Sequence, residues 1–234
     1  MDRFAMAAAL VSRARKHAAW IGDDHGDPYE VAMFADEIGT NLQVTAKEIL
    51  DHLRAALDYC ARQVWQDLSA TPPDAIIYFP IAREGAKASD FASLMNAKMP
   101  GVPAASSNAL ATFAEMQAFS DPANIWLPEL ATLVNSAKHE HLQVAIVPDA
   151  LVHMRRDEDG ISWVSFEPGH GPKRHHPWMA LLQKPGGTPE HMSYEARYLV
   201  LGEINVELAH YLKQAIEGVE QVISRCHALI RGAR

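Results

Sequence analysis

The sequence predicts an α+β protein in which a helical bundle predominates and a small antiparallel β-sheet, a meander, is inserted. Three observations support this class. Apolar residues recur at helical spacing over residues 49–64. The same spacing returns over residues 208–229, near the end of the chain. Between them, residues 142–166 form strand-like runs rich in Val, Ile and Leu, with the turn signal DEDG at residues 157–160.

The N-terminal part is predicted to form one helix followed by two short strands. Residues 2–20 are rich in alanine, with apolar residues at helical spacing. The turn cluster GDDHGDP follows this helix. Residues 29–35 then alternate between apolar and polar, which is typical of a strand, and residues 42–44 predict a short second strand.

A long helix is predicted from about Ala46 to Leu68, and it begins with a capping-box pattern at Thr45 and Glu48. The run AIIYFPI, bounded by prolines, follows at residues 75–81 and predicts an extended segment packed on the helices. Further helices are predicted at residues 90–98, 107–119, 127–141 and 207–231.

These elements predict a single domain over residues 1–234. Apolar residues make up 48% of the chain and charged residues 21%, so a sizeable core is available. The helical core is expected at about residues 1–20, 46–141 and 205–231, and the β-rich portion at about residues 29–44 and 142–204.

Charge and cysteine content narrow the functional classes. The net charge of −8 disfavours a broad face that binds duplex nucleic acid. No apolar run reaches the ~18 residues that a membrane-spanning helix needs, so no membrane partner is predicted. Cys60 and Cys226 do not form a disulfide framework, and a reducing, cytoplasmic location is therefore expected.

Arg54 and Asp58 stand four residues apart on the helix predicted at residues 46–68. On a surface, such a pair stabilises a helix by only about 0.3–0.5 kcal/mol, so one interpretation is an ordinary ion pair. Leu50, Leu57 and Trp65 share that side of the helix, which indicates a half-buried pair. A guanidinium held there by a carboxylate would suit a phosphate or carboxylate ligand.

The second candidate group lies in the sequence NSAKHEHL at residues 135–142. Asn135, Lys138 and His139 have i, i+3, i+4 spacing and therefore project from one helical face. The alternative interpretation is a helix end with Lys and His, which the helix dipole favours. The functional interpretation requires this helix to lie beside the helix that carries Arg54.

Metal and cofactor sites are not predicted. The chain has twelve histidines, and His170, His175 and His176 fall in one predicted loop, but HExxH and paired CxxC motifs are absent. A surface loop is the expected interpretation of these three histidines. The phosphate-binding GxxxxGK[ST] and GxGxxG motifs and the GxSxG nucleophile motif are also absent.

Three segments in order resemble an uncharacterised bacterial protein family. These are DHLRAALDYC at residues 51–60, IYFPI at residues 77–81 and NSAKHEHL at residues 135–142. The family has a helix reading roughly HNLRSALDHL, a TQFPI-like segment and a helix that ends in N-x-x-K-H-x-x-L. The first segment also resembles, distantly, the Arg and His signature of HEPN-type helical bundles. In those proteins the two residues line a cleft that cleaves RNA or holds a nucleotide.

The resemblance implies that Arg54 takes the role of the HEPN arginine and that the partner is RNA or a nucleotide. Tyr59 stands where the histidine would be, so this helix offers no imidazole at that position and binding is favoured over cleavage. His139 is then the candidate for proton transfer, and His52 is nearer in sequence but differently oriented. A homodimer is a candidate assembly.

Two functions remain to be compared. In the first, Arg54 and Lys138 hold the anion of a phosphate-bearing ligand, Asp58 orients Arg54, Asn135 hydrogen-bonds to the ligand, and His139 transfers protons if any reaction occurs. In the second, the same polar residues only tie the helices together in a non-catalytic structural or interaction protein.

Overall fold

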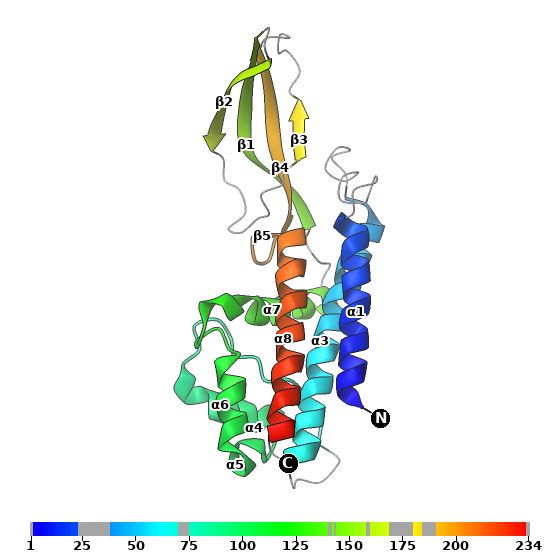
Figure 1. Cartoon of the computed structure of the whole chain (residues 1–234), viewed down its shortest axis with the longest axis vertical. Coiled ribbons are helices and arrows are strands. Elements are labelled where there is room, and N and C mark those ends of the chain that lie inside the picture. Colours follow the sequence, from blue (N-terminus) through cyan, green and yellow to red (C-terminus); the bar gives the residue numbers. More distant parts are fainter. Residues whose placement is uncertain are drawn as a thin grey trace. The chain divides into compact units, whose positions relative to one another are not determined.

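The computed structural model confirms the α+β class: helices predominate, and one antiparallel sheet accompanies them (Figure 1). The described residues are 2–22, 38–69, 75–139, 142, 144–157, 160–168, 180–183 and 191–232. The chain divides into two compact units. The first comprises Met1–His17, Lys47–Glu140 and Lys213–Arg234, and the second comprises Ala18–Ala46 and His141–Leu212. The single-domain organisation stays a prediction.

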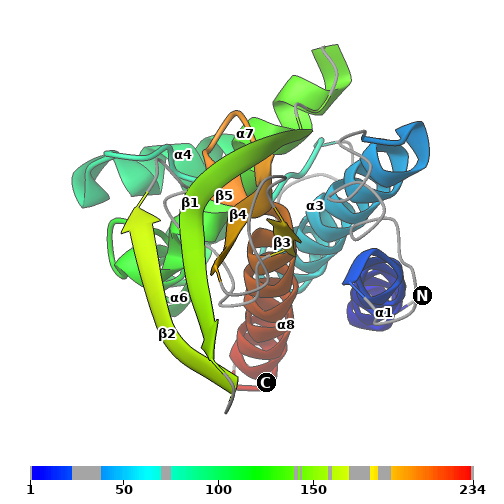
Figure 2. The same cartoon turned by 90° about the horizontal axis from the view of Figure 1, so that it is seen from above.

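Three long helices, which belong to the first unit over most of their length, form its core: α1 (Arg3–Gly22), α3 (Thr40–Leu68) and α8 (Leu208–Gly232). They lie side by side in both views (Figures 1 and 2). Their facing sides are apolar and buried, as the helical spacing predicts. At the edges of this contact Arg15 on α1 forms an ion pair of 2.8 Å with Glu220 on α8. None of the described helices is long and apolar enough to cross a membrane.

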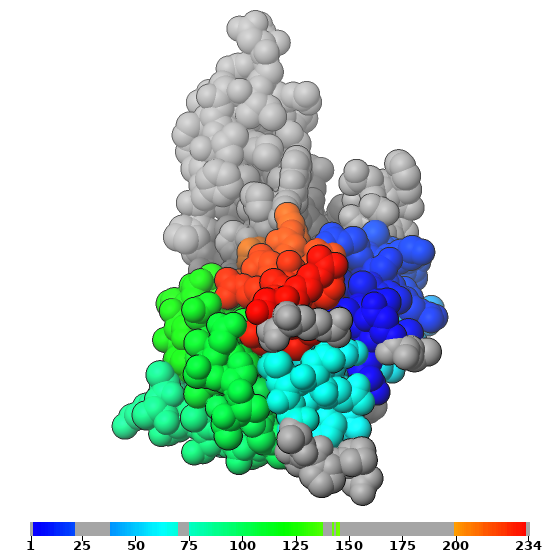
Figure 3. All heavy atoms as spheres, turned by 60° about the horizontal axis from the view of Figure 1, so that its bottom comes forward, coloured from blue at the N-terminus to red at the C-terminus, as the bar shows by residue number. Residues whose placement is uncertain are grey.

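Shorter helices complete the first unit. They are η1 (Ala88–Asp90), α4 (Phe91–Lys98), α5 (Val102–Ala105), α6 (Ser107–Glu115), η2 (Pro122–Ile125) and α7 (Trp126–His139). Ser106 begins α6 by accepting a hydrogen bond from the Ala109 N–H at 3.1 Å, which satisfies one donor of the first turn. Figure 3 shows the segments around α6 (green) against the ends of α3 (cyan) and α8 (red).

Helix α3 begins earlier than the sequence predicts. Residues 42–44 were expected to form a strand, but they belong to the first turns of α3, which starts at Thr40. Leu42 and Ala46 are buried and extend the apolar face that continues at Ile49, so the helical spacing governs this segment. Thr45 therefore lies inside the helix, not at its N-terminus, and the capping-box prediction is wrong.

The second unit contains the sheet, which has strand order β2-β1-β4-β3 with β5 paired to β4. All its pairings are antiparallel, and Figure 2 shows β1 between β2 and β4. Two hairpins are thus joined through β1 and β4, so the strands do not neighbour one another in simple sequence order. The bounds are β1 (Val144–Asp157), β2 (Gly160–Pro168), β3 (Ala180–Gln183), β4 (His191–Leu201) and β5 (Val206–Glu207).

Two runs separated by Pro148 in the sequence form one strand, β1, in the structure. The register between β1 and β4 shifts between Pro148 and Ala150, which marks a bulge or irregularity. Pairing with β2 begins only at Ala150, so Pro148, which has no N–H to donate, lies where only one neighbouring strand is present. Asp157 pairs with Gly160, in agreement with the predicted turn. The strand predicted at residues 29–35 and the three histidines of the predicted loop, His170, His175 and His176, lie outside the described residues.

Helix α8 begins directly after the short strand β5, and a buried carboxylate caps it. Glu207 is only 1% exposed, and its two oxygens accept hydrogen bonds from the N–H groups of Ala209 at 2.8 Å and His210 at 2.7 Å. The N–H groups in the first turn of a helix need acceptors from outside the helical hydrogen-bond pattern, and the negative charge also suits the positive end of the helix dipole.

We expect Gly218→Ala to destabilise the fold although alanine favours helices. A Cβ at position 218 would collide with the indole of Trp126, which is 3% exposed. Overpacking of this kind costs about 1–3 kcal/mol, which urea denaturation would measure as a lower free energy of unfolding. Gly232→Ala on the same helix is the matched control, because nothing lies within 4 Å of its added Cβ. Equal unfolding midpoints for the two variants would contradict the prediction.

Candidate functional site

An extended segment without strand partners organises the candidate site. Residues 75–83 are neither helical nor part of the sheet. Ile77 and Phe79 are 7% and 1% exposed, whereas Ile76 and Tyr78 are 74% and 45% exposed, so side chains alternate between core and solvent as on a strand. Backbone N–H and C=O groups in such a segment need partners, and no described strand provides them. The Tyr78 N–H donates to the Lys98 carbonyl at 3.2 Å, and side chains of α3 and Gln117 supply most of the other partners.

Helix α3 holds the middle of the segment through Arg54 and Asp58. The Asp58 Oδ1 atom accepts a hydrogen bond from the Phe79 N–H at 2.8 Å. Arg54 donates through Nε to Asp58 Oδ2 at 3.3 Å and through Nη2 to the Phe79 carbonyl at 3.5 Å. The side chains of the pair are only 20% and 25% exposed. The pair therefore fastens the segment to α3 and is more than a surface ion pair.

Helix α6 leads into Gln117, which holds the next part of the segment and is fully buried. Its Oε1 atom accepts from the Ala82 N–H at 2.9 Å, and its Nε2 atom donates to the Pro80 carbonyl at 3.2 Å and the Phe113 carbonyl at 3.0 Å. Arg62 on α3 donates to the Ala75 carbonyl at 2.6 Å, at the other end. The amide of Gln117 thus substitutes for a paired strand.

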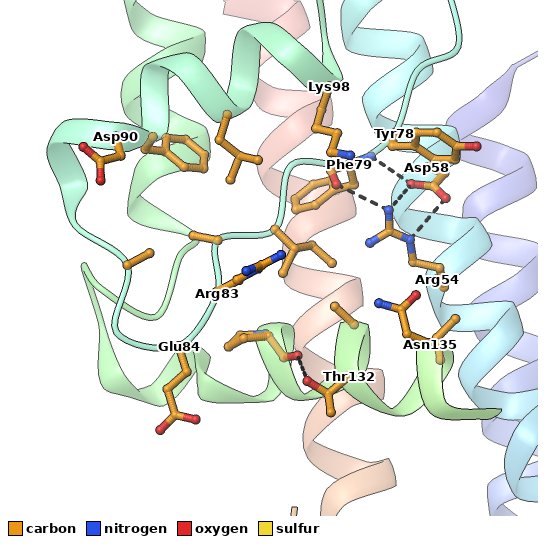
Figure 4. Close-up of a pocket in the computed structure, with 18 of the residues that line it drawn as sticks. Arg54, Asp58, Tyr78, Phe79, Arg83, Glu84, Asp90, Lys98, Thr132 and Asn135 are labelled. Atoms are coloured by element: carbon orange, nitrogen blue, oxygen red, sulfur yellow. Dashed lines mark hydrogen bonds and ion pairs between the residues drawn. The ribbon is translucent and has the colours of Figure 1, made fainter. Parts of the chain in front are cut away.

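A cavity of about 970 Å³ opens beside this segment, entirely within the first unit (Figure 4). Arg54 and Asp58 from α3, Asn135 from α7 and Lys98 from α4 all line it. Residues of the extended segment and of the turn that follows it form another wall. In that turn the Ala86 N–H donates to the Arg83 carbonyl at 3.0 Å, and Gly85 has a φ of 74°, which glycine adopts without strain.

The positively and negatively charged side chains around the cavity point in different directions. In Figure 4 the guanidinium of Arg83 points toward the middle of the cavity, whereas the carboxylates of Glu84 and Asp90 point away from it. The Lys98 ammonium lies 5.8 Å from the centre of the Tyr78 ring at the edge of the cavity. The acid that remains beside the cavity, Asp58, is occupied by Arg54 and the Phe79 N–H. Positive charge is therefore in excess inside.

Three of the predicted site residues come together in this cavity: Arg54, Asp58 and Asn135. Figure 4 shows the Asn135 amide beside the Arg54 side chain. Helix α7 ends at His139, but the side chains of Lys138 and His139 lie outside the described part of the chain. Their roles at the site therefore stay predictions.

The sequence interpretation missed Arg83, Lys98 and Gln117. Arg83 and Lys98 carry ordinary surface-type charges, and only the turn signal in IAREGAK next to the FPI segment could have singled out Arg83. Gln117 lies within the helix predicted at residues 107–119, where no motif distinguishes it, whereas α6 ends at Glu115. Two of its three hydrogen-bond partners, Ala82 and Pro80, lie 35 and 37 positions away in the sequence, and the third, Phe113, lies four positions away.

Other titratable groups of interest lie outside the cavity. The His52 Nδ1 atom contacts the Glu48 carbonyl of its own helix, and its ring meets that of His17 edge to face at 5.8 Å between centroids. The pKa of the Cys226 thiol is raised well above its usual value, mainly by a hydrogen bond with Cys60 and secondly by burial, so this thiol is kept neutral. No group of three potential metal ligands gathers among the residues that the structure describes.

We expect Asp58→Ala to lower the free energy of unfolding by about 2–4 kcal/mol, because a shielded N–H and a shielded guanidinium both lose their partner. Asp51→Ala is the matched control. Asp51 forms the same (i, i+4) pair with Lys47 on α3, at 2.6 Å, but both side chains are more than 40% exposed. That substitution should cost less than about 1 kcal/mol. Similar losses for both variants in chemical denaturation would show that Asp58 does not hold the extended segment.

Comparisons with protein-family models, with curated proteins and with solved structures find no match to this chain. The resemblance to the bacterial family and to HEPN-type bundles therefore stays a prediction from the sequence. The chemistry of the cavity follows from its own residues. Arg54 is held in place by Asp58, Arg83 points inward, and Asn135 provides an amide.

Proposed function

We propose that the helical unit binds a phosphate-bearing ligand in the cavity beside residues 75–83, and that binding does not require turnover. RNA and nucleotides are the ligands that the HEPN-like resemblance favours. The supporting observation is the orientation of charge: Arg83 points into the cavity, Arg54 is held at its wall, and the nearby acids Glu84 and Asp90 point outward. The cavity thus presents positive charge although the whole chain carries a net charge of −8.

Each cation has a distinct part in this proposal. Arg54 is immobilised through Nε and Nη2, which leaves Nη1 without a partner among the described residues. Arg83 has an exposed side chain that forms no ion pair or hydrogen bond with another described residue, and its guanidinium points toward the middle of the cavity. Lys98 adds a charge at the rim, and Asn135 adds an amide donor. Charge-assisted hydrogen bonds contribute about 1.5–3 kcal/mol each, so two or three would suffice for micromolar to millimolar binding.

Binding is favoured over catalysis by the residues at the cavity. No histidine belongs to its described lining, and Asp58 already accepts hydrogen bonds from the Phe79 N–H and Arg54. A general base must have a lone pair directed at the substrate. His139 remains the proposed proton-transfer group if turnover occurs. The proposal includes the cytoplasmic location and the homodimer. The free thiols of Cys60 and Cys226 fit the former.

Arg83→Ala should weaken binding of phosphate-bearing ligands at least about tenfold, since one charge-assisted contact of this strength is lost. The melting temperature should not change, because the Arg83 side chain is exposed and holds no described element in place. Calorimetric titration with inorganic phosphate, adenosine monophosphate and a short oligoribonucleotide would measure the effect. The affinity should also fall as salt concentration rises.

Arg13→Ala provides the matched control, because Arg13 is an exposed arginine on α1 that does not line the cavity. This variant should bind every ligand as the unsubstituted protein does. The proposal fails if the unsubstituted protein binds none of the three ligands, or if Arg83→Ala and Arg54→Ala both bind with unchanged affinity.

A second candidate function is a non-catalytic structural or interaction protein. It is favoured by the observation that Arg54, Asp58 and Arg62, on consecutive turns of α3, are all used to hold the extended segment. Under this function Arg54→Ala would lower the melting temperature, and no ligand would raise it. A ligand that raises the melting temperature of the unsubstituted protein but not of Arg83→Ala would decide for the first function.

A further inference from the structure

The uncharged lining of the cavity is mostly apolar. Its side chains come from the extended segment, from α4 and from α7, and several of them are only partly buried by the protein itself. Partly exposed apolar groups in a concave surface gain from a ligand that covers them. The apolar side chains of this wall include Ile81, Phe91, Leu94, Pro128, Ala131 and Val134.

Few neutral hydrogen-bonding groups remain for a ligand. The Thr132 hydroxyl already donates to the Pro128 carbonyl of its own helix at 3.1 Å. The Tyr78 hydroxyl points away from the cavity in Figure 4. Asn135 is then the neutral side chain in the described lining that presents unused donors and acceptors. A ribose and a base carry many polar groups, and each one that is desolvated without a partner weakens binding.

We propose that the ligand is an amphipathic anion, with an acidic phosphate head beside Arg54 and Arg83 and a hydrocarbon body against Ile81, Leu94 and Ala131. This inference rests on the proposed function, since it assigns the body of the ligand whose phosphate that function requires. It differs from the nucleotide form in what recognises the rest of the molecule. The head is held by charge, and the body is held by removal of apolar surface from water.

Affinity should therefore depend on the length of the hydrocarbon. Each methylene that leaves water strengthens binding about fourfold when fully buried, and about twofold when half-buried as at an open cavity. From methyl phosphate to hexyl phosphate the dissociation constant should fall at least about tenfold, and further if burial is complete. Adenosine monophosphate has the same head and a polar body, so it should bind more weakly than hexyl phosphate.

The experiment titrates the protein with inorganic, methyl, butyl and hexyl phosphate and with adenosine monophosphate, all below micelle-forming concentrations. Hexyltrimethylammonium, which has the opposite charge, tests the head. Leu94→Asn should weaken hexyl phosphate at least about tenfold and leave methyl phosphate unchanged. Leu110→Asn is the matched control, because Leu110 is also half-buried but does not line this cavity. Ala131→Phe, which fills the apolar wall without removing core, should have the same effect as Leu94→Asn and replaces it if that variant does not fold.

The outcomes separate this inference from the proposed function. Phosphate binding with no dependence on chain length, or tighter binding of adenosine monophosphate than of hexyl phosphate, overturns the inference and leaves the proposed function standing. If hexyltrimethylammonium binds as tightly as hexyl phosphate, the cavity does not recognise an anionic head, and the inference is overturned. If no phosphate compound binds, both fall. Vesicles with phosphatidic acid test the second source of such a head: capture of vesicles without binding of hexyl phosphate overturns the inference in favour of a lipid within a bilayer.

Discussion

The fold around the cavity depends on hydrogen-bond partners for the backbone of residues 75–83, an extended segment that pairs with none of the described strands. Buried N–H and C=O groups without partners would each cost about 1–3 kcal/mol. Apolar contacts alone would therefore not hold the segment against α3. Asp58, Arg54 and Gln117 supply these partners from two directions. Phe79 and Phe113, with ring centroids 5.2 Å apart, then fill the space beneath.

In the proposed site, stability of the fold and ligand binding depend on partly different residues. Arg54 and Asp58 both fasten the segment and line the cavity, so their substitution affects the fold independently of any ligand. Arg83 and Asn135 line the cavity and have exposed side chains that hold no described element. Arg54 is thus fixed at the wall of the cavity, whereas the exposed Arg83 points toward its middle. Fixed cations need little reorganisation when an anion arrives, which favours binding.

Local apolar patterns were sufficient for the long helices and for the class of fold. Cys60, Val64 and their neighbours repeat at helical spacing, and all of them are buried as that spacing predicts. The pattern failed where it was short. Residues 42–44 contain too few positions to distinguish a strand from a helical turn, and only the continuation of the apolar face through Ala46 assigns them to α3. The order of the strands also needed tertiary contacts, because β1 pairs with β4 between residues 36 to 57 positions apart, from Arg155 with His191 to Val144 with Leu201.

For the site, the sequence by itself determined that Arg54 and Asp58 would meet, because four residues on a helix bring side chains together. It also indicated that Asn135 would lie on a helix and the FPI segment would be extended. Only the tertiary structure decided that the Phe79 backbone is their partner, that Gln117 is buried, and that Arg83 points inward. Such contacts join residues far apart in the chain, and hydrogen bonds between them leave no periodic signal in the sequence.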